Sequence, residues 1–121
     1  MRPDAVAPDG SDVRVLLSVA GGSLAHFELG AGETSISVEH RTVEEVWYVV
    51  SGSGQIAIDG DIVSVRAGSS VLIPTATPFQ FRAFGAGPLA AIGVTIPPWP
   101  GEGEATPVVG HWEPTVSTRH R

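Results

Sequence analysis

The sequence predicts an all-β domain, a sandwich or a barrel, and three observations support this. The chain has 121 residues and a mass of 12.5 kDa, which suits one domain. About nine short apolar runs rich in β-branched residues follow one another at regular spacing, and none has the period of an amphipathic helix. The 15 glycines and 10 prolines are spread through the chain, as expected of turns between strands.

Each predicted strand ends at glycine, proline or a polar break. The runs are 13–19, 24–29, 34–38, 46–50, 55–58, 61–65, 70–73, 79–84 and 88–96. Asp59-Gly60 gives the strongest hairpin signal in the chain. In the run 46–50 strict alternation places Glu45 with Trp47 and Val49 on one face. The opposite face carries Glu44, Val46, Tyr48 and Val50; because both faces are apolar, a central strand covered on both sides is expected.

The two ends of the chain differ from the middle. Residues 1–12 form a polar, proline-containing arm, and residues 97–121 contain five prolines, which exclude a helix or a central strand. Trp99 and Trp112 are expected to pin residues 97–113 across the domain body, because such large apolar side chains gain most when buried. Residues 114–121 are expected to be loose.

Composition excludes several classes of function. Seven basic and 13 acidic residues give a net charge of −6, which does not suit nucleic acid. No apolar stretch approaches the length of a membrane span, and the N-terminus lacks the apolar core of a signal peptide, so a cytoplasmic protein with no membrane partner is expected. The absence of cysteine excludes disulfides, thiolate metal sites and cysteine nucleophiles.

The densest polar patch between predicted strands is His40-Arg41-Thr42-Val43-Glu44-Glu45. The segment HRTVEEVWYVVSGSG (40–54) resembles the first motif of the cupin superfamily, with His40, Glu45 and Gly52 at matching positions. The segment GSSVLIPTATPFQFRAFG (68–85) resembles the second motif through Gly68 and Pro74. The resemblance implies a single cupin β-barrel, the double-stranded β-helix or jelly roll, over residues 13–96.

Two of the four metal-ligand positions implied by this resemblance are lost. Cupins that bind a divalent metal use three histidines and one glutamate, and here Val38 and Phe79 replace two of the histidines. No cofactor is therefore predicted, since two ligands fall short of the three a metal site needs. A divalent metal on His40 and Glu45 would require an unrecognised third ligand. Gln80 is expected on the opposite face from Phe79, and His26 is expected to point outward.

The predicted barrel interior favours a small-molecule ligand pocket. Its catalytic candidates are His40 as acid and base and Glu45 as the group that orients it, since burying the two costs several kcal/mol unless they are paired. The predicted ligand-binding residues are Trp47, Phe79, Phe81 and Val38. The resemblance to cupin isomerases, epimerases and cyclases implies non-redox proton transfer.

Two alternatives stay open: a non-catalytic, ligand-sensing or structural cupin, and a metal-dependent cupin enzyme. A homodimer is also expected. The outer face of Val46, Tyr48 and Val50 would otherwise leave a large apolar surface in water, and cupins commonly pair.

Overall fold

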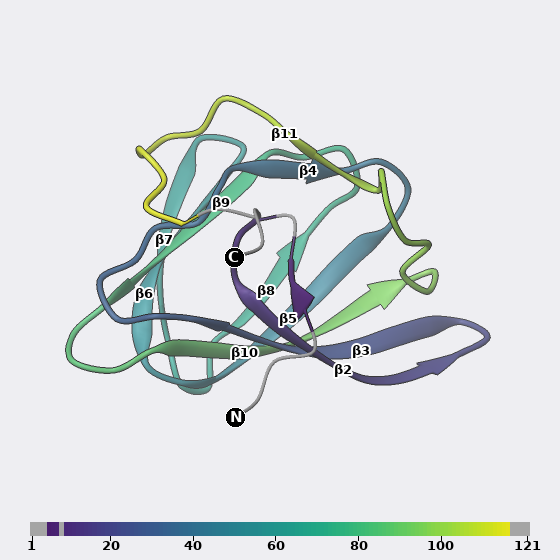
Figure 1. Cartoon of the computed structure of the whole chain (residues 1–121), viewed down its shortest axis with the longest axis horizontal. Helices are drawn as coiled ribbons and strands as arrows, with labels where there is room; N and C mark the ends of the chain where they lie inside the picture. Colours follow the sequence, from purple (N-terminus) through teal and green to yellow (C-terminus); the bar gives the residue numbers. More distant parts are fainter. Residues whose placement is uncertain (1–4, 8, 117–121) are drawn as a thin grey trace.

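The computed structural model describes residues 5–7 and 9–116, which form eleven strands and no helix within that range (Figure 1). The strands are β1 (Ala5–Val6), β2 (Asp12–Val19), β3 (Gly22–Leu29), β4 (Val38–His40), β5 (Glu44–Ser51), β6 (Ser53–Ile58), β7 (Asp61–Arg66), β8 (Ser70–Ile73), β9 (Phe79–Phe84), β10 (Leu89–Ile96) and β11 (Ala105–Pro107). The predicted all-β class is confirmed. No helix in the described range has the length and apolarity to cross a membrane.

Two antiparallel sheets enclose the interior. One sheet has the strand order β1-β2-β3-β10-β5-β8, and the other has the order β11-β4-β9-β6-β7. Figure 1 shows the strands of the two sheets wrapping round a common interior, with the β2–β3 hairpin extending to one side. β5 lies between β10 and β8, so residues far apart in the sequence meet on its inner face.

The predicted hairpin at Asp59-Gly60 is confirmed. These two residues connect β6 to β7, with Ile58 paired to Asp61 across the turn. Both have positive φ, 50° and 86°, as a two-residue type I′ turn requires. The local sequence thus sets the register of this strand pair.

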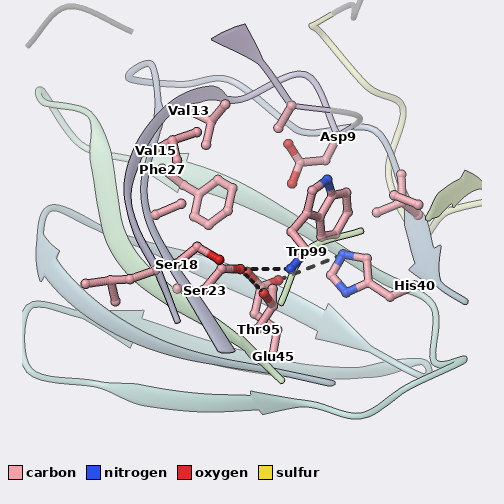
Figure 2. Close-up of a pocket in the computed structure, with 16 residues that line it drawn as sticks. Asp9, Val13, Val15, Ser18, Ser23, Phe27, His40, Glu45, Thr95 and Trp99 are labelled. Carbon is pink, nitrogen blue, oxygen red and sulfur yellow. Dashed lines mark hydrogen bonds and ion pairs between the residues drawn. The ribbon is translucent and has the colours of Figure 1, made fainter. Parts of the chain in front are cut away.

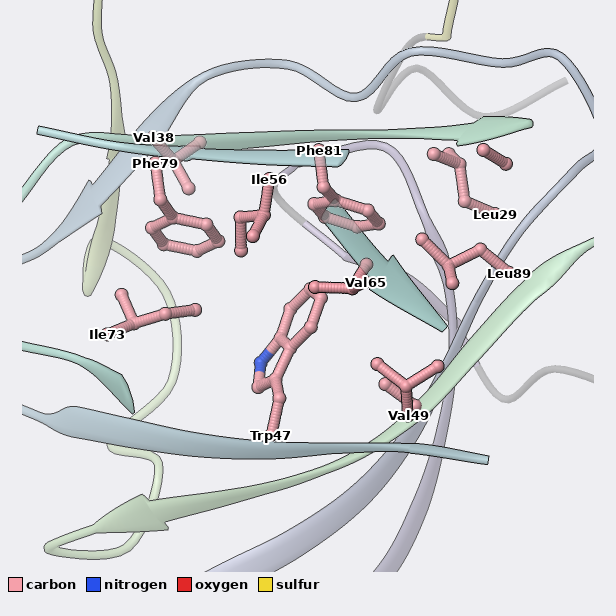
Figure 3. Packing of buried hydrophobic residues seen from close by; sticks show 12 residues of the cluster. Leu29, Val38, Trp47, Val49, Ile56, Val65, Ile73, Phe79, Phe81 and Leu89 are labelled. Atoms are coloured by element: carbon pink, nitrogen blue, oxygen red, sulfur yellow. The ribbon is translucent and has the colours of Figure 1, made fainter. Parts of the chain in front are cut away.

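The apolar core fills the barrel away from β2 (Figure 3). Trp47 lies at its centre, with ring centroids 4.8 Å from Phe81 and 6.2 Å from Phe79 in edge-to-face arrangements. Val49, Ile56, Ile73 and Leu89 surround these rings and are fully buried. Such close packing of large side chains makes this the most stabilising part of the fold.

One expectation for β5 is wrong in the single chain. Its inner residues Glu45, Trp47 and Val49 are buried as predicted, but Glu44, Val46, Tyr48 and Val50 are exposed. The alternation of β5 is therefore as predicted, but no described part of the chain covers its second face. Burial within a single domain does not explain why that outer face is apolar.

Both ends of the chain add to the barrel. Ala5 pairs with Val13, so the described part of the arm includes a short strand. At the other end β11 pairs with β4, and Arg82 stacks on the ring of Trp112 at 4.2 Å. Thr115 donates a backbone hydrogen bond to Thr34, so residues 114–116 are held; residues 117–121, also expected to be loose, lie outside the described range.

Candidate active site

A cavity of about 370 Å³ opens between β2, β3, β4 and β10, beside the packed core (Figure 2). Its size is typical of sites for small organic molecules. Most of its wall is apolar, and a few polar side chains converge on it. The lining residues that matter below are Asp9, Ser23, Phe27, His40, Glu45, Thr95 and Trp99.

His40 and Glu45 both line this cavity, at the positions that the cupin resemblance singled out. His40 ends β4 and Glu45 lies near the start of β5, so the short loop between them brings both side chains inward. Nε2 of His40 lies 3.9 Å from Oε1 of Glu45, and the two side chains are 5% and 3% exposed. This distance is too long for a hydrogen bond. The expected bond by which Glu45 would orient the imidazole is therefore not formed.

Burial decides the protonation state of Glu45. Loss of hydration raises the pKa of its carboxyl to about 8, and the nearby negative charge of Asp9 acts in the same direction. The indole N–H of Trp47 opposes this shift, although Nε1 forms no hydrogen bond of ordinary geometry. Near neutral pH Glu45 is consequently a protonated acid.

His40 is shifted in the opposite sense. Burial lowers the pKa of its imidazole, and the charge of Glu104 only partly counters this. Nδ1 of His40 is buried and has no hydrogen-bond partner among the described residues. Near neutral pH the ring is neutral and can accept a proton.

Glu104 fixes the loop between these two residues. Its Oε2 accepts hydrogen bonds from the backbone N–H groups of Thr42 and Val43, at 2.7 and 2.8 Å, and its Oε1 accepts one from the Thr42 hydroxyl at 2.7 Å. Burial raises the pKa of Glu104, but these bonds outweigh it and hold the pKa below its usual value. An ionised carboxylate from the C-terminal segment thus holds the β4–β5 connection in place.

A second carboxyl group enters the cavity from the N-terminal arm. Asp9 is 6% exposed, and burial raises its pKa although Oδ1 accepts hydrogen bonds from the backbone and hydroxyl of Ser11. Its backbone carbonyl accepts a hydrogen bond from Ile36, which ties the arm to the segment before β4. Figure 2 shows its carboxyl directed into the cavity, across from Glu45.

Aromatic rings and hydroxyl groups complete the wall. Phe27 stacks on Trp47 behind it, with centroids 5.8 Å apart. Trp99 contacts the edge of the His40 ring at 5.2 Å, and its backbone N–H donates to Ser23 Oγ. The hydroxyls of Ser23 and Thr95 are hydrogen-bonded to each other. The cavity therefore offers apolar walls with a small number of polar groups.

Only one of the four predicted ligand-binding residues lines the cavity. Val38 does so, on β4. Trp47, Phe79 and Phe81 lie in the packed core instead, one layer behind it, because their rings fill the space between the sheets. Gln80 points the other way, as expected, and its amide bonds to Ser35 and Trp112.

Sequence reasoning missed two residues that shape the site. Asp9 lies between Pro8 and Gly10, a setting typical of a surface turn, so no local signal marks it. Gly93 carried a signal, since an isolated glycine within a strand indicates close approach of another group. A Cβ at Gly93 would lie 2.7 Å from both Glu45 Oε2 and Phe27. This glycine makes room for the two inward side chains.

The residues of the cavity do not fit a divalent metal. Val38 and Phe79 offer no donor atom at the two positions where metal-binding cupins carry histidine. Over residues 5–7 and 9–116, no three histidine, aspartate or glutamate side chains are grouped so as to hold a metal ion. The third ligand on which the metal-dependent alternative relies is thus not found in the described part of the chain.

Comparison with known proteins gives a consistent result. Residues 25–95 match the family described as the cupin domain. An uncharacterized protein of Methanocaldococcus jannaschii is 30% identical over 99 residues, which cover 78% of this chain and 79% of that protein.

Two solved structures show the same fold. A conserved protein with a double-stranded β-helix domain from Klebsiella pneumoniae superimposes with a TM-score of 0.72 at 17% identity, over 90% of each chain. Streptomyces PAC13, described as a nucleoside dehydratase, superimposes with a TM-score of 0.73 at 16% identity, over 88% of this chain and 85% of that one. At these identities the likeness concerns the fold alone.

Proposed function

The chain belongs to the cupin family, and on that premise we propose that its cavity catalyses a non-redox proton transfer on a small organic molecule, as an isomerase or cyclase does. The observation that carries this proposal is that His40 and Glu45 lie buried in one cavity, 3.9 Å apart and without a hydrogen bond between them. Burial there lowers the pKa of the imidazole and raises that of the carboxyl. Opposite shifts of two neighbouring groups supply a base and an acid at the same pH.

The pair supports a balanced reaction. The imidazole of His40 removes a proton from a carbon beside a carbonyl group, and the electrons of that C–H bond form the C=C bond of an enol. Glu45 gives its proton to the carbonyl oxygen as the C=O electron pair moves onto that oxygen. Return of the oxygen-bound proton to Glu45 and of the His40 proton to the same carbon regenerates the substrate, with solvent hydrogen exchanged in. Where the enol is conjugated with a further C=C bond, delivery of the His40 proton to the far carbon of that bond moves the double bond and completes an isomerisation with no net proton change.

The surroundings favour this assignment. The apolar wall excludes water, which strengthens both proton transfers and keeps Glu45 protonated. The hydroxyls of Ser23 and Thr95 provide hydrogen bonds for a polar substituent. A structural neighbour is named a nucleoside dehydratase, and dehydration likewise moves protons without a change of oxidation state.

Exchange of carbon-bound hydrogen with solvent tests the proposal. The protein would be incubated in D₂O with a panel of small ketones, aldehydes and amino ketones, and deuterium incorporation followed by proton NMR. We expect incorporation into one compound class, reduced by about 100-fold or more in His40→Gln and in Glu45→Gln.

Glu44→Gln is the matched control, because Glu44 is exposed on the other face of the same strand, and it should retain the wild-type rate. Binding of a panel compound without exchange would favour the ligand-sensing alternative. Exchange that survives His40→Gln would refute the proton-transfer assignment.

A further inference from the structure

The cavity carries an unbalanced set of polar groups. Asp9 and Glu45 both face it, and both are at least nine-tenths buried. The chain contains no lysine, and none of its described arginines is among the lining residues. Among the described residues, the titratable groups that line the cavity are these two carboxyls and His40, and Glu104 lies behind the β4–β5 loop.

His40 does not supply the missing positive charge. Its side chain is 5% exposed, its Nδ1 has no partner among the described residues, and its Nε2 stops 3.9 Å from Glu45. Burial keeps the ring neutral near pH 7. A ligand could therefore form the hydrogen bond that His40 lacks. It could also supply a cation to the carboxyl groups of Asp9 and Glu45.

The walls suit the body of such a ligand. Phe27 and Trp99 present aromatic surface on two sides of the cavity, and Val13, Ala25 and Val38 add aliphatic surface (Figure 2). Aromatic faces attract cations as well as apolar groups. An anion, by contrast, would face two carboxyl groups, and no lysine or arginine among the lining residues could pair with it.

We infer that the cavity selects a small organic cation: an amine with a compact apolar body, whose ammonium group lies between Asp9 and Glu45. The inference concerns the ligand class of the site proposed above and rests on that cavity being the ligand site. It goes further by naming Asp9 as a binding residue and by excluding carboxylate and phosphate ligands.

Three probes of the same shape and different charge test this inference. Cyclohexylamine, cyclohexanol and cyclohexanecarboxylate would be titrated into the wild-type protein by calorimetry at about pH 7. The amine should bind about ten- to a hundredfold more tightly than the alcohol, which is the effect of one charged hydrogen bond, and the carboxylate should bind more weakly than both.

Variants of the same size and shape show which carboxyl groups cause the preference for the amine. Asp9→Asn and Glu45→Gln should each reduce the preference for the amine over cyclohexanol. Glu44→Gln should behave as the wild type.

Equal binding of amine and alcohol would overturn the cation inference and leave the cavity standing as the ligand site. If no probe binds, both the inference and the proposed site fail. Tight amine binding without any deuterium exchange would defeat the proposed reaction alone.

Discussion

Nε2 of His40 and Oε1 of Glu45 lie 3.9 Å apart, too far for a hydrogen bond between them. Each group therefore takes its protonation state mainly from burial, which leaves the imidazole neutral and the carboxyl protonated near pH 7. A hydrogen-bonded ion pair would instead have lowered the carboxyl pKa and raised that of the imidazole. The gap is what permits one residue to act as a base and the other as an acid.

Glu45→Gln should change how stability depends on pH. Because the folded-state pKa of Glu45 is raised from 4.5 to about 8, the native protein keeps a proton that the unfolded chain loses in this window. Its contribution is complete below pH 4.5 and lost as pH rises to about 8, with a slope of up to about 1.4 kcal/mol per pH unit. Urea unfolding at a series of pH values should show a flatter dependence for Glu45→Gln.

Glu44→Gln serves as the exposed control and should keep the wild-type slope. His40 acts in the opposite direction in both proteins: its pKa is lowered, so stability falls as pH drops below 6.5. Parallel curves for wild type and Glu45→Gln above pH 6.5 would contradict the buried, protonated carboxyl.

Glu104→Ala should destabilise the protein although Glu104 lies in the irregular C-terminal segment. The substitution leaves the N–H groups of Thr42 and Val43 without their acceptor, at a cost of about 1–3 kcal/mol. Glu102→Ala is the control, since Glu102 is exposed two residues away. Equal unfolding free energies for the two variants would show that the segment does not anchor the β4–β5 loop.

Gly93→Ala should crowd the active site while the barrel persists. The added methyl group meets Glu45 Oε2 and the Phe27 ring, and displacing these side chains should cost about 1–3 kcal/mol. Gly21→Ala has open space around its new Cβ and should leave stability nearly unchanged. Urea unfolding of the two variants measures the difference, and a neutral Gly93→Ala would argue against close packing beneath Glu45.

The homodimer expected from the sequence stays a prediction. Val46, Tyr48 and Val50 of β5 are 40–54% exposed, and Leu72 lies beside Val46 on β8, so the apolar outer face continues across strands. Sedimentation at micromolar concentration should give about twice the chain mass of 12.5 kDa. Tyr48→Glu should shift the mass to that of one chain, whereas Val63→Glu on the other sheet should not.

A monomeric wild type would exclude this dimer. If Leu17→Glu on β2 separated the chains and Tyr48→Glu did not, the interface would lie on the β2–β3 hairpin instead, where Leu17 is 60% exposed.

The fold could be predicted because its signals are local. Alternation along β5 placed Glu45 on one face with Trp47 and Val49, and Asp59-Gly60 predicted a hairpin, without knowledge of distant contacts. How deeply a side chain lies in the barrel, by contrast, depends on contacts between distant segments. Trp47 and Phe81 point inward as predicted, yet whether they line a cavity or fill a core depends on how far apart the two sheets lie.

Asp9 could not be predicted for the same reason. Its position depends on the hydrogen bond that its backbone carbonyl accepts from Ile36, which joins two segments separated in the sequence. The cupin resemblance implied that His40 and Glu45 lie together, but the 3.9 Å gap between them depends on three-dimensional packing. Their roles as base and acid follow from that gap.

NMR titration of the folded protein tests the central claim most directly. The side-chain carboxyl carbon of Glu45, assigned by comparison with Glu45→Gln, should titrate with a midpoint of about 8, and the His40 ring should titrate below 6.5. Near pH 7 the carboxyl would then carry a proton that the imidazole lacks. A Glu45 midpoint near 4.5, with His40 titrating above 6.5, would show an ordinary ion pair and contradict the acid–base assignment.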